Sequence, residues 1–298
     1  MGALLQRLEE KRLLVADGAW GTLLQAKGLE AGTCPELWNV EQPETVRSVA
    51  AAYAEAGSDL VLTNTFGGST LALRRHGLME RTAELNKAGA RLSLEGAPGK
   101  LVAASIGPTG EFLVPMGELS EEQMTAAFAV QIRAVLEAGV RILCVETMSC
   151  VEEAVCAVRA ARAVAAELSV AVEVMATMTF THTPKGYRTF MGVDCRTAAE
   201  KLSEAGVDVL GSNCGNGIEQ MVPIASEFRR NTDKPILIQA NAGLPQIEDG
   251  VTVFRQSPEH MARWVPEVVE AGASIVGGCC GTNPEHIRAI RREIDRLL

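Results

Sequence analysis

The chain has 298 residues, of which 47% are hydrophobic and 22% are charged, and its formal net charge is −9. An acidic chain with no run or stripe of Lys and Arg is not expected to bind nucleic acid. The charged N-terminal segment lacks the apolar centre of a signal peptide, and no stretch approaches the roughly 18 consecutive apolar residues of a membrane span, so we expect a cytoplasmic protein with no membrane partner.

Short apolar runs alternate with longer helical segments along the whole chain. The runs predict β-strands at 13–18, 60–65, 102–107, 142–147, 172–178, 209–214, 236–241 and 275–280. Helices are predicted between them, for example at 44–56, 120–138, 151–167, 257–271 and 284–297. Eight strand–helix units in this order predict a (β/α)8 TIM barrel, which usually takes about 250 residues, rather than a doubly wound open sheet. No linker interrupts the pattern, so residues 1–298 are expected to form a single domain.

A weak internal repeat sets the register of four of these strands. The tripeptide Glu-Ala-Gly ends the helix before each even-numbered strand, and its glycine is the expected helix-terminating residue because glycine tolerates positive φ. Seven or eight residues after this glycine stand the polar or thiol pairs Asn64-Thr65, Glu146-Thr147, Asn213-Cys214 and Cys279-Cys280. These positions are the carboxyl ends of the strands, where (β/α)8 barrels carry their chemistry. We therefore expect the four pairs at one mouth of the barrel.

The strongest local signal is the segment Ile275-Val276-Gly277-Gly278-Cys279-Cys280-Gly281-Thr282. Adjacent cysteines on a regular strand point to opposite faces, so both can reach one site only where the backbone leaves the strand, which the neighbouring glycines allow. A third thiol, Cys214, ends a strand two places away in the barrel. Three thiolates with a fourth position left open are the ligand set of a catalytic rather than a structural zinc site. Cys214, Cys279 and Cys280 are therefore the predicted metal ligands.

Two other interpretations of these cysteines stay open. Each thiol could simply be buried in a glycine-rich loop, and Cys279 and Cys280 could form a vicinal disulfide, which is strained and unexpected in a reducing compartment. The other cysteines, at positions 34, 144, 150, 156 and 195, show no metal-like spacing. A chain of this size without a secretion signal also does not suggest a disulfide framework.

Seven short motifs, in order over nearly the whole chain, resemble those of one protein family. They are Asp17-Gly18-Ala19-Trp20-Gly21-Thr22, Thr63-Asn64-Thr65-Phe66, Gly107-Pro108-Thr109-Gly110, Glu146-Thr147, Gly211-Ser212-Asn213-Cys214, Asn241-Ala242-Gly243 and Gly277-Gly278-Cys279-Cys280-Gly281-Thr282. Each is weak by itself, but the set resembles the homocysteine-binding domain (homocysteine S-methyltransferase) family. That family includes the first module of cobalamin-dependent methionine synthase, betaine–homocysteine methyltransferase and S-methylmethionine–homocysteine methyltransferase.

The resemblance implies a site and an activity. In the family, three cysteines bind Zn²⁺ and the sulfur of homocysteine takes the fourth position; here Cys214, Cys279 and Cys280 would be these ligands and the catalytic residues. Asn241, at the end of the seventh strand, would be either a weak oxygen ligand in the substrate-free state or a backbone-bonding turn residue. A free thiol has a pKa of ~8.5, so zinc would supply at neutral pH the thiolate that attacks a methyl group and gives methionine.

The amino-acid end of homocysteine needs contacts of its own. Glu146 is placed to accept a hydrogen bond from the ammonium group, because an apolar strand rarely ends in a buried acid without a partner. Asp17 is expected to help directly or through water, although it could also be a turn residue that bonds to its own backbone. Backbone N–H groups around Gly18 and Ala19 are expected to bind the carboxylate, since glycine allows a close approach.

Further side chains carry two interpretations each. Thr63 and Asn64 are predicted to line the pocket, although Thr and Asn at strand ends also serve as structural caps. Trp20 either lines the donor side of the pocket or packs in the core. His182 follows the fifth strand at the mouth, where it either faces the site or lies in an exposed loop. The other histidines fall in helical regions and are expected at the surface or at helix caps: His76, His260 and His286.

The methyl donor is the open part of the prediction. The chain ends at Leu298, after the last helix, which leaves no room for the folate-binding, cobalamin-binding and activation modules of full-length cobalamin-dependent methionine synthase. The donor is then either methylcobalamin on a separate corrinoid protein or a small onium compound such as S-methylmethionine or betaine. The motifs at 17–22 and 63–66 resemble the cobalamin-dependent enzymes and favour the first. Selenocysteine or another thiol would also suit the acceptor site.

Two different classes of function are alternatives. A metal-free barrel lyase or aldolase would need a Schiff-base lysine or an acid–base pair at strand ends, and no lysine stands at a predicted strand end. A non-enzymatic zinc-binding partner of a corrinoid protein, or a thiol-storage protein, would use the same cysteines. The open ligand position and Glu146 favour turnover. Metal content together with product analysis separates these cases.

Overall fold

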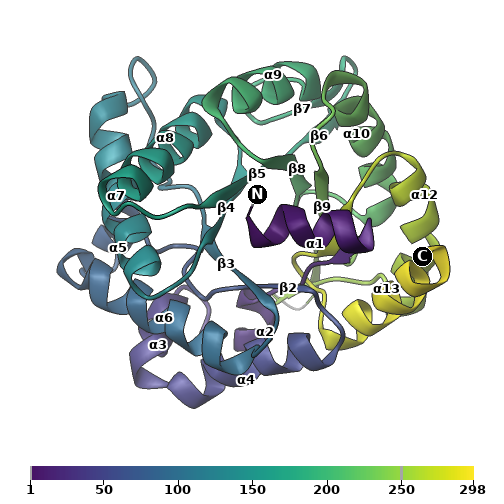
Figure 1. Cartoon of the computed structure of the whole chain (residues 1–298), viewed down its shortest axis with the longest axis horizontal. Coiled ribbons are helices and arrows are strands. Elements are labelled where there is room, and N and C mark those ends of the chain that lie inside the picture. The colour runs from purple at the N-terminus through teal and green to yellow at the C-terminus, as the bar shows by residue number, and fades with distance from the viewer. Residues whose placement is uncertain (1, 249–250) are drawn as a thin grey trace.

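The computed structural model describes residues 2–248 and 251–298, and its centre is one sheet of eight parallel strands (Figure 1). The strands are β1 (Leu14–Val15), β2 (Leu60–Leu62), β3 (Leu101–Ile106), β4 (Ile142–Met148), β5 (Glu173–Met178), β8 (Val209–Asn213), β9 (Ile236–Ala240) and β12 (Ile275–Gly278). They lie in the order β1-β12-β9-β8-β5-β4-β3-β2, and a parallel bridge from Ala16 to Leu60 joins the two edges. The predicted (β/α)8 barrel and its eight strands are confirmed, and the open-sheet alternative is wrong.

Helices surround the barrel, and one of them lies across its amino-terminal end (Figure 1). They are α1 (Ala3–Lys11), α2 (Gly21–Ala26), η1 (Pro35–Leu37), α3 (Trp38–Glu41), α4 (Pro43–Glu55), α5 (Thr70–Arg74), η2 (Met79–Arg81), α6 (Thr82–Gly96), α7 (Glu121–Glu137), α8 (Val151–Glu167), α9 (Cys195–Ala205), α10 (Ile218–Asn231), α11 (Pro258–Arg263), α12 (Val265–Glu270) and α13 (Pro284–Leu297). Among the described residues, none of these helices is long and apolar enough to span a membrane.

Four of the five example helices are confirmed, and the fifth is corrected. The segment predicted as one helix over 257–271 is two helices, α11 and α12, which meet at Trp264. Pro266 explains the break, because proline lacks the N–H that a continuous helix would direct to Ala262, and its ring would clash with that carbonyl. Periodicity alone does not show where such a break falls.

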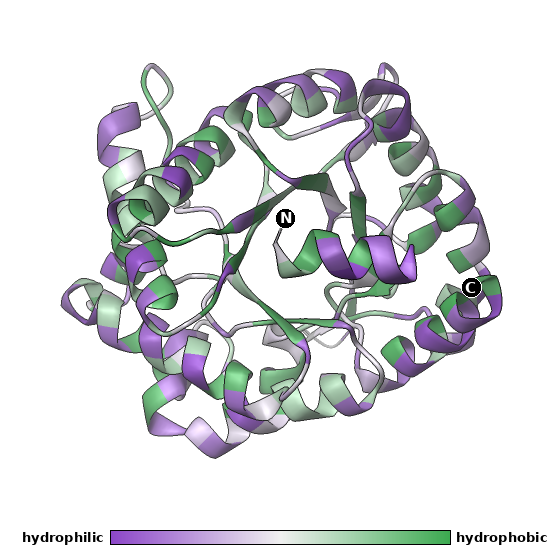
Figure 2. Cartoon of the chain, viewed as in Figure 1, coloured by the Kyte–Doolittle hydropathy of each residue, from purple (hydrophilic) through white to green (hydrophobic). Residues whose placement is uncertain are grey.

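Apolar side chains pack in two layers, one inside the barrel and one between the strands and the helices. Successive residues of a strand point to opposite sides. Leu60 and Leu62 therefore pack inside the barrel, whereas Val61, between them, packs outward. Figure 2 shows strands that are mostly green and helices with purple outer surfaces, in agreement with this arrangement. Towards the carboxyl ends of the strands the inward positions become polar, for example at Ser105 and Glu146.

Helix α1 closes the amino-terminal end of the barrel, across which it lies in Figure 1. Its Leu4 and Leu8 pack into the apolar interior. The carboxylate of Glu173, the first residue of β5, accepts hydrogen bonds from the N–H groups of Leu4 and Leu5, both at 2.8 Å. An anion at this place interacts favourably with the helix N-terminus. The carboxyl-terminal end is left as the mouth of the barrel.

The glycines of the internal repeat adopt the predicted conformation. Their φ angles are 100° at Gly57, 108° at Gly139, 89° at Gly206 and 114° at Gly272, in the region that favours glycine. The next strand begins three residues after each of them. This common spacing explains why the repeat brings the ends of four strands to a similar depth at the mouth.

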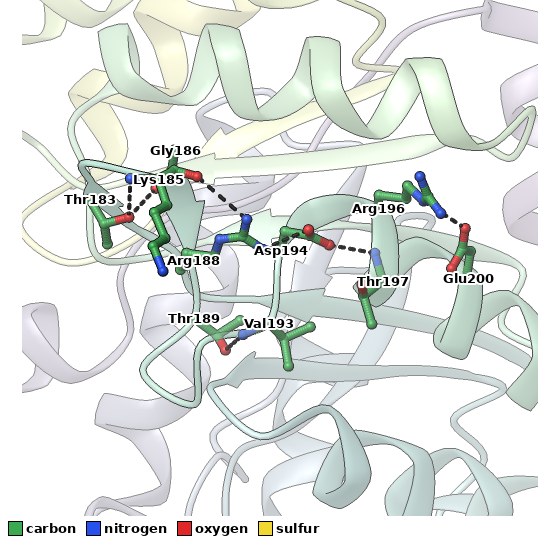
Figure 3. A network of polar contacts seen from close by, with 10 residues as sticks. All are labelled: Thr183, Lys185, Gly186, Arg188, Thr189, Val193, Asp194, Arg196, Thr197 and Glu200. Atoms are coloured by element: carbon green, nitrogen blue, oxygen red, sulfur yellow. Dashed lines mark hydrogen bonds and ion pairs between the residues drawn. The ribbon is translucent and has the colours of Figure 1, made fainter.

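Two antiparallel hairpins extend the loops after β5 and β9, namely β6 (Thr181–Thr183) with β7 (Gly186–Arg188) and β10 (Gln246–Glu248) with β11 (Val251–Val253). Figure 3 shows how the first hairpin is tied to the start of α9. Arg188 pairs with Asp194 at 2.6 Å, and Asp194 accepts a hydrogen bond from the Thr197 N–H at 2.8 Å as the helix N-cap. These contacts hold the hairpin as a fixed part of the rim.

Candidate active site and metal centre

A cavity of 490 Å³ lies at the mouth, between the strand ends and the loops that follow them. Most of the predicted site residues line it: Gly18, Ala19, Thr63, Asn64, Glu146, Cys214, Cys279 and Cys280. Asp17 and Asn241 are buried next to these lining residues. A concave site with a few convergent polar groups is the usual form of a small-molecule site.

The three predicted thiols converge in the wall of this cavity. The Sγ atoms of Cys214, Cys279 and Cys280 all lie within 4.8 Å of one another, and Cys214 Sγ is 3.8 Å from Cys280 Sγ. All three are free thiols, so Cys279 and Cys280 do not form a vicinal disulfide in this structure. The cysteines come from the ends of β8 and β12, which are separated by β9 alone. The arrangement could hold one metal ion with three sulfur ligands.

The backbone leaves regular strand geometry at each thiol, as predicted. β12 ends at Gly278, and the Cys279 N–H donates to the Ala240 carbonyl at 2.7 Å. Gly281, directly after the pair, has a φ of 80°. Cys214 itself has a φ of 59°, a left-handed conformation that is rare for a residue with a side chain. These turns bring adjacent cysteines, and one from another strand, to the same point.

The three thiols change one another's pKa through their hydrogen bonds. Hydrogen bonds from the side chains of Cys279 and then Cys280 lower the pKa of Cys214 to about 3. Donation to Cys214 raises the pKa of Cys280 to about 12 and the pKa of Cys279 well above its usual range. A cation at this cluster would favour the thiolate forms, so metal binding there would release protons.

Asn241 lies beside the thiol cluster. Its side chain is within hydrogen-bonding reach of Cys214 and helps to lower the pKa of that thiol. Its Oδ1 atom is buried and has no hydrogen-bond partner among the described residues. Its backbone N–H donates to the Asn216 carbonyl at 2.9 Å. Both earlier interpretations, oxygen ligand and backbone-bonding residue, are therefore compatible with the position.

Glu146 reaches the cavity from β4. Ser105 Oγ donates to its Oε1 at 2.5 Å, and Asn213 Nδ2 donates to its Oε2 at 3.1 Å. Burial is the main cause that raises the pKa of Glu146 to about 7, and the charges of Asp17 and Cys214 raise it further. A buried acid with a raised pKa gains stability from a cationic partner, which is the property expected of an ammonium-binding group.

Asp17 is fully buried, and one of its oxygens is engaged by the protein. Oδ2 accepts hydrogen bonds from the Leu62 N–H at 2.7 Å and from the Trp20 indole Nε1 at 2.8 Å. Oδ1 has no partner among the described residues. Burial raises the pKa of Asp17 to about 7. Trp20 is half-buried, packs against the core and also lines the cavity, while its predicted place on the donor side stays a prediction.

The remaining predicted residues also make structural contacts. Thr63 Oγ1 accepts a hydrogen bond from the Ser105 N–H at 3.1 Å. Asn64 Nδ2 donates to the Pro35 carbonyl at 2.7 Å, which ties the β2 end to η1. The Ala19 N–H donates to Thr282 Oγ1 at 3.1 Å, so this amide is already partnered. Thr63 and Asn64 thus both line the cavity and hold its walls.

Several side chains of the cavity were not predicted from the sequence. Glu36 is buried in η1, lines the cavity and accepts from the Gly67 N–H at 2.6 Å and from Cys34 Sγ at 3.2 Å. Phe66 and Arg75 also line it, and Arg75 donates to the Thr109 carbonyl. Phe66 stands in a quoted motif, but no local pattern marks Glu36 or Arg75. Only the folded chain brings them to the mouth.

The histidines have different positions. His76 is exposed, as expected, but it also lines the cavity. His182 is exposed on β6, and its ring lies edge-on to the Tyr187 ring, with 5.2 Å between the ring centroids. His260 pairs with Glu219 at 2.5 Å, and His286 caps α13. Of the residues described, those of the β6–β7 hairpin do not line the cavity, so the exposed-loop interpretation of His182 holds.

Comparison with known proteins decides the family. The model of the homocysteine S-methyltransferase family matches residues 14–294, which is nearly the whole chain. The chain belongs to this family. The predicted resemblance is confirmed, and the predicted enzyme class, a methyltransferase, agrees with the description of this family, whereas a metal-free lyase or aldolase disagrees with it.

Two relatives of this chain are longer proteins that match it over part of their length. Methionine synthase from Mycobacterium tuberculosis (strain ATCC 25618 / H37Rv) is 29% identical over 303 residues, which covers 96% of this chain and 25% of that protein. Methionine synthase from Mycobacterium leprae (strain TN) is 28% identical over 302 residues, which covers 96% of this chain and 24% of that protein. The chain therefore spans about a quarter of the length of these relatives.

A solved structure matches along the whole barrel. The homocysteine methyltransferase MmuM from Escherichia coli, in its metallated form, is 25% identical with a TM-score of 0.79. The match covers 98% of this chain and 99% of that chain. This chain therefore resembles both a solved structure of similar length and about a quarter of a longer protein.

Proposed function

We propose that this family member, with residues 1–298 as one domain, is a zinc-dependent enzyme that methylates the sulfur of homocysteine and gives methionine. The observation that carries the proposal is the cluster of three Sγ atoms within 4.8 Å of one another, in a cavity that also holds the buried Glu146. Such a site combines a place for a thiol with a place for an ammonium group. Binding of homocysteine needs both a place for its thiol and a place for its ammonium group.

The thiol cluster fits Zn²⁺. Zinc–sulfur bonds of about 2.3 Å at tetrahedral angles place ligand sulfurs roughly 3.8 Å apart, and Cys214 Sγ and Cys280 Sγ are 3.8 Å apart. Three thiolates leave one tetrahedral position open, and Asn241, whose Oδ1 has no hydrogen-bond partner among the described residues, is proposed to supply a weak oxygen ligand in the substrate-free state. When bound, zinc would hold the acceptor sulfur as a thiolate near neutral pH.

The chain's own residues would hold the rest of homocysteine. The Glu146 carboxylate is proposed to accept a hydrogen bond from the ammonium group of homocysteine, which would favour the ionised form of the acid. The carboxylate of homocysteine is proposed to bind backbone N–H groups around Gly18 and Ala19. The Ala19 N–H would then donate to this carboxylate in place of Thr282 Oγ1. Asp17 is proposed to contribute its charge from behind the wall. Thr63 and Asn64 complete the pocket.

Methylcobalamin on a separate corrinoid protein is the proposed methyl donor. The methionine synthase relatives are about four times as long as this chain, so in them the matching segment works beside other segments. Large apolar side chains are exposed on the loops around the mouth, as expected for a protein-docking surface. These residues are Phe66, Phe112, Val114, Met116, Phe190, Leu244 and Ile247.

A small onium donor is the second candidate. The match to MmuM along the whole barrel supports it, because that protein is a barrel of similar extent. The aromatic rings of Trp20 and Phe66 and the carboxylate of Glu36 line the cavity. Aromatic faces and carboxylates are the groups that bind sulfonium and quaternary ammonium cations. S-methylmethionine and betaine would be such donors, and selenocysteine would be an alternative acceptor.

One experiment tests the proposal. Zinc content and methionine formation are measured for the reduced wild type, for Cys214→Ser and for Cys150→Ser, a matched control outside the cluster. We expect about one zinc per chain in the wild type and control and much less in Cys214→Ser, because serine does not replace a thiolate ligand of zinc. Methylcobalamin, S-methylmethionine and betaine are supplied in turn, and methylcobalamin is expected to give methionine.

Each other outcome has a defined meaning. Turnover with S-methylmethionine or betaine in place of methylcobalamin would establish the second candidate donor. Zinc binding without methionine from any donor would favour the non-enzymatic partner. Wild-type protein without zinc would reject the proposed chemistry.

A further inference from the structure

Asn213 is buried behind the cavity lining and contacts both Glu146 and Cys279, which line the cavity. It is the last residue of β8 and is fully buried. Its Oδ1 accepts hydrogen bonds from the Thr147 N–H and from Thr177 Oγ1, both at 2.8 Å. Its Nδ2 lies 2.7 Å from Thr147 Oγ1, 3.1 Å from Glu146 Oε2 and 3.8 Å from Cys279 Sγ. One side-chain amide thus connects the strand that carries Glu146 with the strand that carries a predicted metal ligand.

The orientation of this amide is determined by its partners. A backbone N–H can only donate, so the oxygen of Asn213 must face Thr147. The NH₂ group must then face Glu146 and Cys279. A carboxylate and a thiolate only accept, so the NH₂ group suits both neighbours in their ionised forms. If the amide were rotated by half a turn, it would lose the hydrogen bond from the Thr147 N–H and direct its oxygen at Glu146.

The same amide also supports a strained turn. Thr147 has a φ of 61°, which is unusual for a β-branched residue. The β4–β5 register shifts between Val145 and Met148, on either side of Glu146 and Thr147. Both the N–H and the hydroxyl of Thr147 bond to Asn213. An irregularity of this kind redirects a side chain, and here Thr147 lines the cavity together with Glu146, which holds the regular inward position of β4.

We propose that Asn213 is a positioning residue that sets the distance between the Glu146 carboxylate and the thiol cluster. A planar amide has no internal freedom, so its contacts with Oε2 and with Cys279 Sγ fix one group relative to the other. Asn213 thereby selects acceptor thiols whose ammonium lies at the spacing found in homocysteine. The inference rests on the proposed function, since it assigns the ammonium to Glu146 and the acceptor sulfur to the cluster.

The variant Asn213→Asp tests the inference because it has the same shape. One carboxylate oxygen can still accept from Thr147 and Thr177, whereas the other replaces the donor with a negative group beside Glu146. The test compares homocysteine with 4-mercaptobutanoate, the same thiol without its amino group, by calorimetric binding and by kcat and KM. Zinc content is measured in the same samples.

We expect the Kd and KM for homocysteine to rise about tenfold or more, which corresponds to about 1.4 kcal/mol. The values for 4-mercaptobutanoate should change less than about threefold, because that thiol does not use the ammonium site. Thr177→Val, which removes one anchor of the amide but keeps its donors, should shift selectivity in the same direction by a smaller factor. The Thr177→Val variant also tests the inference if Asn213→Asp does not fold.

The control is Thr179→Val, which removes a 3.0 Å hydrogen bond to the backbone carbonyl of Asn213 and leaves the amide intact. Its selectivity should equal that of the wild type. Equal losses for both thiols in the Asn213 and Thr177 variants would show a merely structural role and overturn the inference. A wild type that binds neither thiol would instead reject the proposed function, and the inference with it, so the two failures are distinguishable.

Discussion

At the scale of single residues, the site depends on conformations that most residues avoid. Cys214 has a φ of 59° and Thr147 a φ of 61°, and such positions cost a non-glycine residue about 1–3 kcal/mol each. Hydrogen bonds to other strands hold both residues. The Cys214 N–H donates to the Gln239 carbonyl at 3.1 Å, and the Thr147 N–H donates to Asn213 Oδ1 at 2.8 Å. One of the two strained residues belongs to the thiol cluster, and the other directly follows Glu146.

Gly211 gives a prediction at this scale. A Cβ atom at this position would lie 1.9 Å from the Leu237 carbonyl oxygen, which belongs to the neighbouring strand and cannot move independently. Gly211→Ala should therefore destabilise the fold by about 3 kcal/mol or more, at the upper end of overpacking effects. Urea unfolding measures the change.

The matched control is Gly21→Ala. A Cβ atom there meets nothing within 4 Å, and Gly21 begins α2. Its effect should stay within about 0.5 kcal/mol. If Gly211→Ala were as mild as this control, the close contact between β8 and β9 would be disproved.

At the scale of elements, side-chain caps determine where helices begin at the mouth. Ser120 and Gln123 form a capping box at α7, and Asn283 and His286 form one at α13. His286 also contacts the Gln256 carbonyl through Nε2 at 2.9 Å. The cap of α13 follows directly on the cysteine segment of β12. The expectation that His286 caps a helix is confirmed, although it is buried rather than exposed.

The buried cap makes stability depend on pH. Burial lowers the pKa of His286 below its ordinary value of 6.5. The unfolded chain therefore takes up this proton first, so the stabilising contribution is present above pH 6.5 and is lost as the pH falls through the folded pKa. The variant His286→Gln keeps a capping-box residue but does not titrate.

Between about pH 7 and 5 the wild type should lose more stability than His286→Gln, by up to roughly 1.4 kcal/mol per pH unit. Denaturant unfolding at several pH values measures the difference. His182→Gln, on the exposed hairpin, is the control and should follow the wild type. Parallel curves for wild type and His286→Gln would contradict the assignment.

At the scale of the whole molecule, the barrel is closed at one end and open at the other. Helix α1 covers the amino-terminal end, where Leu4 and Leu8 pack inside the barrel and Glu173 holds the helix N-terminus. The polar and thiol groups gather at the opposite end. The buried acids Asp17 and Glu146, with pKa values raised to about 7, are costly for the fold, and the closed apolar end helps to offset them.

Closure by α1 predicts that one leucine of this helix supports the whole barrel. Leu4 is completely buried, whereas Gln6, half a turn further on, is exposed. Leu4→Ala should destabilise the protein by about 2–5 kcal/mol, as for other buried leucines. Gln6→Ala should change stability by less than about 0.5 kcal/mol. Thermal unfolding measures both, and equal effects would mean that α1 does not pack as described.

The sequence by itself determined the eight strands of the barrel and the thiol site. Strand and helix patterns are local, so alternation and the Glu-Ala-Gly repeat predicted eight strands and their register. Barrel topology then places all carboxyl ends at one mouth, which brings Cys214 to Cys279 and Cys280 without further information. The break at Pro266 was missed because the periodicity continues across it.

Only the tertiary structure decided which other groups reach that mouth. Glu36 and Arg75 belong to connecting segments whose course depends on the packing of the whole barrel, and no local pattern marks them. The central role of Asn213 was missed for a related reason. Its partners stand 34 to 67 residues away in the chain, and hydrogen bonds over such separations exist only after the barrel has closed.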